Sequence, residues 1–253
     1  MSGLTPLLSP SASGGRADEV VRRITEAIHL GLLADGERLP AETELAAQFG
    51  VAPMTMRDAL AILRDEGLLV TKRGRHGGSF VQRPQSPPLD RLRQRLVAMT
   101  PTAIRDLVDE HAAVAGHTAK LAAERAAAPN VRRLFTLTEQ LGSATNTGDR
   151  IRADCRFHIE LAVASQSQRL TRHEVSLQAE VSGMLWLPSD GADGTPGPRA
   201  DLEGVVAEHH EIATAVVAED AERARRLAEA HVARNLRRLT DLHLHLTSKE
   251  DRA

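Results

Sequence analysis

A chain of 253 residues, of which 42% are apolar, can form the cores of about two domains. Aromatic residues make up only 2% and the net charge is −2, which favours a helical core of Ala, Leu and Val and excludes a uniformly basic protein. The single cysteine, Cys155, excludes an intramolecular disulfide and suits a reducing cytoplasm, and no apolar run approaches the ~20 residues that cross a bilayer.

The chain begins with residues rich in Ser, Gly and Pro. Residues 1–15 lack the basic start of a signal peptide, so we expect a disordered tail there. Residues 18–33 are predicted to form a helix, because Val20, Ile24 and Ile28 recur at helical spacing.

Residues 38–67, RLPAETELAAQFGVAPMTMRDALAILRDEG, indicate two helices joined by a tight turn. Gly50 ends the first helix, because glycine tolerates the left-handed conformation found there, and Pro53 suits the first position of the second. This is the helix-turn-helix pattern, whose second helix enters the DNA major groove.

A basic, glycine-rich loop follows the helix pair. Short apolar runs at 68–70 and 79–81 have strand character and flank residues 71–78, TKRGRHGG. We expect a β-hairpin "wing", whose glycines allow the turn and whose cations meet phosphate. A plain helical hairpin with a solvated basic loop is the alternative, but the order of helix pair, strand, loop and strand favours the winged helix.

A proline-rich segment at 84–88, PQSPP, predicts a linker between a winged helix-turn-helix domain at 16–83 and a second domain at 89–248. After residue 89 the periodicity indicates helices only, broken by short turns and by a Gly/Pro/Asp loop at 188–198 that we expect to be mobile. The predicted fold class is therefore mainly α, with a second domain built as a bundle of six or seven helices.

Three predicted helices of the second domain each place an imidazole on their apolar face. Asp154 and His158 are four residues apart and share one such face, while His209 and His231 lie on the apolar faces of two later helices. An unpaired buried polar group costs about 1–3 kcal/mol, so we expect the four side chains to share a divalent metal. Any one of the histidines alone is better explained as an ordinary core or surface residue.

Two sets of motifs resemble a known family. GERLPAETELAAQFGV, TMRDALAILRDEGLLV and GRHGGSFV are similar in order and spacing to the winged helix of the GntR family of bacterial transcription regulators. D-x3-H at Asp154 and His158, and EHHEI…AEDAERARRLAEAHV around His209 and His231, resemble the all-helical FCD-type effector domain of the FadR-like subfamily. The resemblance implies a homodimer on a two-fold double-stranded DNA operator, a divalent metal (Zn, Ni or Mn) held by these four residues, and a small-molecule effector, commonly a carboxylate.

The first domain departs from the family pattern at its DNA-reading positions. Thr43 stands where an Arg usually contacts DNA, and Ala52, Pro53 and Met54 replace a hydroxyl, an Arg and another hydroxyl. Losing two arginines removes the commonest direct readout of guanine, so we expect a different operator or weaker binding, with loss of DNA binding as the alternative. The residues expected to contact DNA are Thr43, Thr55, Arg57, Lys72, Arg73, Arg75 and His76.

The second domain departs from the pattern as well. His111 occupies the place of an inward Arg that could hold an acidic effector, and a histidine is a weaker anion clamp that titrates near neutrality. Asn235 follows His231 by one helical turn. We expect His111 and Asn235 to line the effector site, and Trp186 to lie in the core or in an interface.

These observations favour a cytoplasmic, ligand-responsive transcription regulator, by default a repressor, that is not an enzyme. A metal-dependent enzyme with an appended winged helix is one alternative. Against it, Glu208 and Glu211 flank the histidine pair but adjacent helix positions point elsewhere, which leaves no obvious general base. The other alternative is a regulator whose metal is purely structural.

Overall fold

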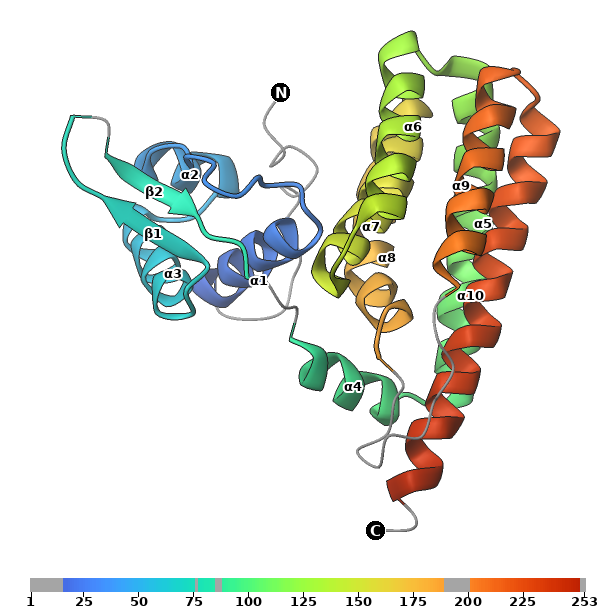
Figure 1. The fold of residues 1–253 in the computed structure, drawn as a ribbon. Helices are drawn as coiled ribbons and strands as arrows, with labels where there is room; N and C mark the ends of the chain where they lie inside the picture. The colour runs from blue at the N-terminus through green and yellow to red at the C-terminus, as the bar shows by residue number, and fades with distance from the viewer. Residues whose placement is uncertain (1–15, 76, 85–87, 189–200, 251–253) are drawn as a thin grey trace. The chain divides into compact units, whose positions relative to one another are not determined.

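The computed structural model describes residues 16–75, 77–84, 88–188 and 201–250, with side chains described to residue 248. The chain divides into two compact units, Met1–Gln85 and Ser86–Ala253 (Figure 1). The expected tail at 1–15, nearly all of the expected loop at 188–198, and His76 lie outside the described residues.

Three helices and a β-hairpin make up the first unit. α1 (Arg16–His29) ends earlier than the predicted residue 33, because the chain turns at Gly31, whose φ is +70°. α2 (Glu42–Phe49) and α3 (Pro53–Asp65) are joined at Gly50, whose φ of 66° is the left-handed conformation expected of a glycine there. The side chains at the centre of this unit are fully buried: Ile24, Leu45, Met56, Leu60 and Leu63.

The hairpin pairs β1 (Leu69–Lys72) with β2 (Gly78–Val81) in antiparallel register, with Leu69 opposite Val81 and Lys72 opposite Gly78. Leu69 and Val81 are buried, whereas Lys72 is exposed near the tip. The predicted winged helix-turn-helix is thus confirmed.

Seven helices form the described part of the second unit, which agrees with the predicted bundle. They are α4 (Leu89–Ala98), α5 (Pro101–Arg125), α6 (Ala128–Ser143), α7 (Thr147–Ala164), α8 (Gln168–Leu185), α9 (Leu202–Val217) and α10 (Ala221–Glu250). A break predicted at 129–130 falls instead within the first turn of α6, where proline's missing N–H costs nothing. Four of these helices begin at a side-chain cap that accepts a hydrogen bond from the backbone N–H three residues on: Thr100, Asn146, Ser167 and Asp201.

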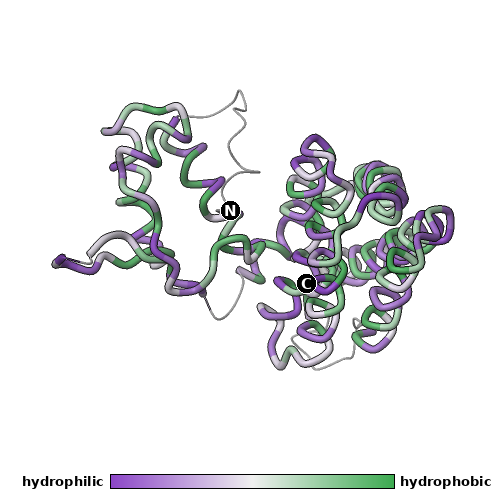
Figure 2. The backbone as a smooth tube through the Cα atoms, turned by 90° about the horizontal axis from the view of Figure 1, so that it is seen from above, coloured by the Kyte–Doolittle hydropathy of each residue, from purple (hydrophilic) through white to green (hydrophobic). Residues whose placement is uncertain are grey.

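The bundle places α7 in its interior. α7 packs against α5, α6 and α8, while α9 packs against α5, α6 and α10, and α5 and α10 lie side by side (Figure 1). Polar and apolar residues alternate along most helices (Figure 2), and among the described residues no helix is long and apolar enough to cross a membrane. Side chains on the inward faces of α7, α9 and α10 come close to one another inside the bundle, and several of them are polar.

Candidate metal centre and DNA-binding surface

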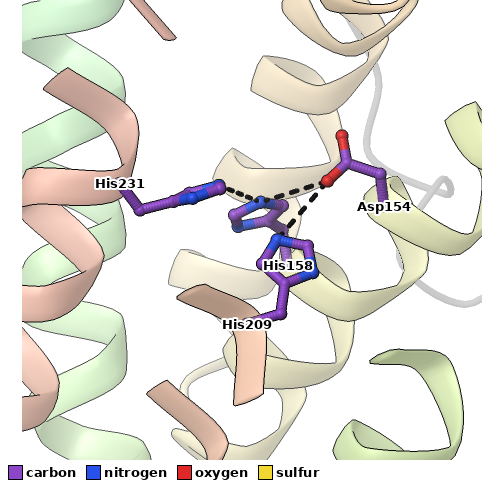
Figure 3. Close-up of side chains that lie close together, drawn as sticks. All are labelled: Asp154, His158, His209 and His231. Atoms are coloured by element: carbon purple, nitrogen blue, oxygen red, sulfur yellow. Dashed lines mark hydrogen bonds and ion pairs between the residues drawn. The ribbon is translucent and has the colours of Figure 1, made fainter. Parts of the chain in front are cut away.

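Four polar side chains from three helices converge in the core of the second unit (Figure 3). α7 supplies Asp154 and His158 one helical turn apart, α9 supplies His209, and α10 supplies His231. Each is at most 4% exposed, and one potential ligand atom from each lies within 4.8 Å of the others. The structure thus brings together all four residues expected to hold a metal.

The contacts inside this cluster leave one imidazole without any hydrogen bond. His231 Nε2 lies 3.2 Å from His158 Nε2, and Asp154 Oδ1 lies 3.4 Å from His209 Nε2 and 3.9 Å from His158 Nε2. The His209 ring stacks on Phe157, with centroids 3.9 Å apart, and neither of its nitrogens has a hydrogen-bond partner among the described residues. Leaving such a group unsatisfied costs about 1–3 kcal/mol, so the donor set fits a cation that would accept the lone pair of His209.

Two further residues orient the cluster from outside. Trp186 Nε1 donates a hydrogen bond to Asp154 Oδ2 at 2.9 Å, and His231 Nδ1 donates to Glu208 Oε2 at 2.6 Å. Arg234 forms an ion pair with Glu208. Because Glu208 fixes the proton on Nδ1, the Nε2 lone pair of His231 faces the cluster, as in carboxylate–histidine–metal arrangements.

Glu208 was expected to point elsewhere than its neighbours His209 and His210. It reaches His231, on another helix, because α9 and α10 pack side by side. Trp186 is buried, as expected, and it also holds one oxygen of Asp154.

Burial sets the charge state of the cluster. Burial lowers the pKa of His158 to about 3, with help from the nearby His231, and it lowers the pKa of His209 well below its ordinary value. Burial also raises the pKa of Asp154, against the hydrogen bond from Trp186. His158 and His209 are therefore neutral at pH 7 and present lone pairs, which is the form that ligates metals.

A second buried polar group adjoins the first through the His158 ring. The ring centroids of His111 and His158 lie 5.8 Å apart, and His111 Nε2 donates to Glu174 Oε1 at 3.1 Å. Gln178 Nε2 donates to the same oxygen at 2.8 Å. Burial would raise the pKa of Glu174, but the facing His111 lowers it to about 2. Within the described residues, Glu174 Oε2, Gln178 Oε1 and His111 Nδ1 have no hydrogen-bond partner.

Glu174 and Gln178 were not among the residues expected at a site. Both lie on the buried face of α8, which continues at Val181 and Leu185. A carboxylate on that apolar stripe was the signal that could have identified Glu174.

A small cavity of about 20 Å³ opens beside the cluster of Asp154 and the three histidines. It is lined by Asp154, Leu185, Trp186, Val205, His231, Asn235 and Arg238. Asn235 shares this lining with His231, whereas His111 contacts the cluster on the His158 ring and is not part of this lining. Arg238 donates from Nε to Leu185 O at 2.6 Å, and burial lowers its pKa to about 10, with Asp154 opposing the shift.

The residues expected to contact DNA lie on the surface of the first unit. Thr43 on α2 and Arg57 on α3 are exposed, Thr55 is half-buried, and Arg57 Nε lies 3.4 Å from Glu42 Oε2. On the wing, the Lys72 ammonium lies 4.6 Å from the centroid of the Phe80 ring.

Two more of these residues, Arg73 and Arg75, are exposed between the strands of the wing. Nearby, a cleft of about 370 Å³ is lined in part by Arg38 and Arg64, neither of which is among the residues expected to contact DNA. The exposed cations of this unit thus extend from α3 to the tip of the wing.

A winged helix-turn-helix unit followed by a helical unit with a buried polar centre defines a DNA-binding regulator with an effector domain. The profile of bacterial regulatory proteins of the gntR family matches residues 16–81, and the FCD domain profile matches residues 106–234. The chain belongs to the GntR family of transcription regulators, in the subfamily with an FCD domain.

Three relatives show the range of this similarity. RmpR of Mycobacterium gastri, assigned as an HTH-type transcriptional regulator, is 44% identical over 94% of this chain and 85% of its own. A protein of Escherichia coli K12 assigned as the L-lactate dehydrogenase operon regulatory protein is 34% identical over 60% of this chain and 59% of its own. The Glc operon transcriptional activator of the same strain is 26% identical over 89% of this chain and 90% of its own.

Proposed function

We propose that this regulator binds a divalent metal through Asp154, His158, His209 and His231 and senses a small carboxylate beside it. The observation that carries the proposal is the unpartnered imidazole of His209, which lies within 4.8 Å of a carboxylate oxygen and two further imidazole nitrogens. Three imidazoles and one carboxylate suit Zn, Ni or Mn. A bound metal would supply a Lewis-acidic position for an oxygen of the effector.

The chain's own residues supply the rest of the proposed effector site. Asn235 and Arg238 follow His231 on the same face of α10, and all three line the cavity next to Asp154. At about 20 Å³ this cavity holds about one water, so an effector would enter by displacing the side chains around it. The guanidinium of Arg238 would pair with the carboxylate of the effector. His111, on the first long helix, is less suited to this role. This supports an acidic effector despite the missing arginine on α5.

Effector binding is proposed to change the affinity of the winged helix for its operator. The functional unit is a homodimer whose recognition helices meet two half-sites about 34 Å apart. A coupling of about 1–3 kcal/mol between effector and DNA suffices for a switch. We propose repression that the effector relieves. The relative from the Glc operon is named an activator, so the direction of the response has to be measured.

Elemental analysis of the purified protein tests the metal site. The wild type should carry about one metal per chain, and His231→Ala should lose it. His210→Ala is the matched control, because His210 neighbours His209 but is exposed. No metal in the wild type, even after incubation with zinc, nickel or manganese, would remove the metal from the proposal.

DNA binding in the presence of acids tests the effector site. One relative's name ties it to an L-lactate dehydrogenase operon, so L-lactate is the first probe, followed by other 2-hydroxy acids, which can chelate a metal. An acid that changes operator affinity in the wild type but not in Arg238→Ala would support the site. If removing the metal lowers the melting temperature and leaves the response to acids unchanged, the metal is purely structural. If the metal-loaded protein converts the acid, the enzymatic alternative is correct.

A further inference from the structure

The first turn of the recognition helix α3 presents carbon, with no polar side-chain atom, at three successive positions. Ala52, Pro53 and Met54 are all exposed, and Met54, at 62%, has the largest exposed fraction among the large apolar side chains of the described residues. Met56 is fully buried in the core, and Thr55 is half-buried. This turn can therefore make mainly apolar contacts with a base.

The first turn of α3 also has one backbone donor fewer, because Pro53 has no N–H, while the N–H groups of Met54 and Thr55 remain. The residue before it, Ala52, makes no side-chain cap bond to the helix. The end of the helix that lies against the bases thus carries a flexible thioether side chain as its longest group.

Residues at the N-terminus of a recognition helix contact base edges in the major groove. In that groove only thymine offers an apolar group, its 5-methyl, while the other edges are hydrogen-bond donors or acceptors. A methionine set against those edges would leave their donors or acceptors unpaired, whereas set against the methyl group it removes apolar surface from water on both sides.

We propose that Met54 reads the 5-methyl group of a thymine in each operator half-site. Arg57 lies three residues on, about 4.5 Å along the helix axis, and its side chain is exposed beside Glu42. Arg57 is the group suited to a guanine edge. The thymine therefore lies within about two base pairs, at ~3.4 Å each, of the base that Arg57 contacts.

Replacing thymine by uracil tests the proposal, because it removes this methyl group and changes nothing else on the base. An operator would first be selected from random double-stranded DNA with the full-length protein. Uracil would then be placed at each thymine of one half-site in turn. For the wild type, uracil at one position should weaken binding about fourfold, the value of one buried methyl group.

The variant Met54→Ala should bind the thymine and uracil operators equally, since it lacks the side chain that meets the methyl group. Ile62→Ala is the matched control: Ile62 is a partly exposed apolar residue at the other end of α3, and its loss should leave the uracil effect intact. The proposal is overturned if the wild type tolerates uracil at every position, if Met54→Ala keeps the uracil effect, or if the selected half-sites hold no thymine near the guanine.

Discussion

The two units keep their functional side chains in opposite environments. In the winged unit the side chain of Arg57 is 64% exposed and that of its partner Glu42 is 38% exposed. In the helical unit Asp154, His209 and His231 are at most 3% exposed, and His209 has no hydrogen-bond partner in the described structure. Water already solvates the first set of side chains, whereas the second set is buried and is proposed to bind a metal. Substitutions should therefore change binding alone in the first unit, but both binding and stability in the second.

Removing the metal should have the largest effect on stability. A ligand present at 100 times its Kd stabilises the folded state by about 2.7 kcal/mol. A chelator added to zinc-loaded wild type should therefore lower the Tm of the helical unit by about 5–10 °C in calorimetry. The Tm should not respond in His209→Leu. Without metal, that variant should be at least as stable as the wild type, because leucine buries no unpaired nitrogen against Phe157. If the chelator leaves the Tm of the zinc-loaded wild type unchanged, the stability of the helical unit does not depend on a metal, and the contrast between the units is wrong.

The second largest effect is expected from replacing Glu208, the carboxylate that accepts a hydrogen bond from His231. Glu208→Gln keeps the size of the side chain but removes the charge that holds His231, and such substitutions weaken metal affinity about 10- to 100-fold. Titration with a competing chelator measures this loss. Glu211→Gln, on an exposed position of the same helix, should bind metal like the wild type. Equal affinities for the two variants would mean that Glu208 has no part in the site.

Glu208 and Glu174 show what the sequence could and could not predict. Helix periodicity and the turn at Gly50 are local signals, so the helices, the winged helix-turn-helix and the convergence of His209 and His231 with Asp154 followed from them. The bond from His231 to Glu208 did not, because it depends on how α9 packs against α10. Glu174 was missed for a similar reason: its partner His111 lies on another helix, 63 residues away in the chain.

In the winged unit, Arg57→Ala tests the other half of the contrast. Its exposed ion pair with Glu42 contributes at most about 1 kcal/mol to folding, so the Tm of this unit should hardly change. Affinity for the selected operator should fall about tenfold, as for the loss of one base contact by arginine. Arg22→Ala is a suitable control, because Arg22 on α1 is also exposed and ion-paired, with Glu19 and Glu26. A large drop in Tm with unchanged DNA affinity would mean that Arg57 stabilises the fold and does not contact DNA.

The smallest effect is expected from a substitution in the wing. Lys72 lies over the Phe80 ring near the tip, in position to meet a phosphate instead of a base. Lys72→Ala should therefore weaken binding to all DNA sequences alike and reduce the slope of log affinity against log salt by about 0.9, the value of one phosphate contact. Lys120→Ala should leave the slope unchanged, since Lys120 is a half-buried lysine of the helical unit paired with Glu222. A loss confined to one DNA sequence would instead make Lys72 a base-reading residue, so that the wing would share in the specificity assigned here to α3.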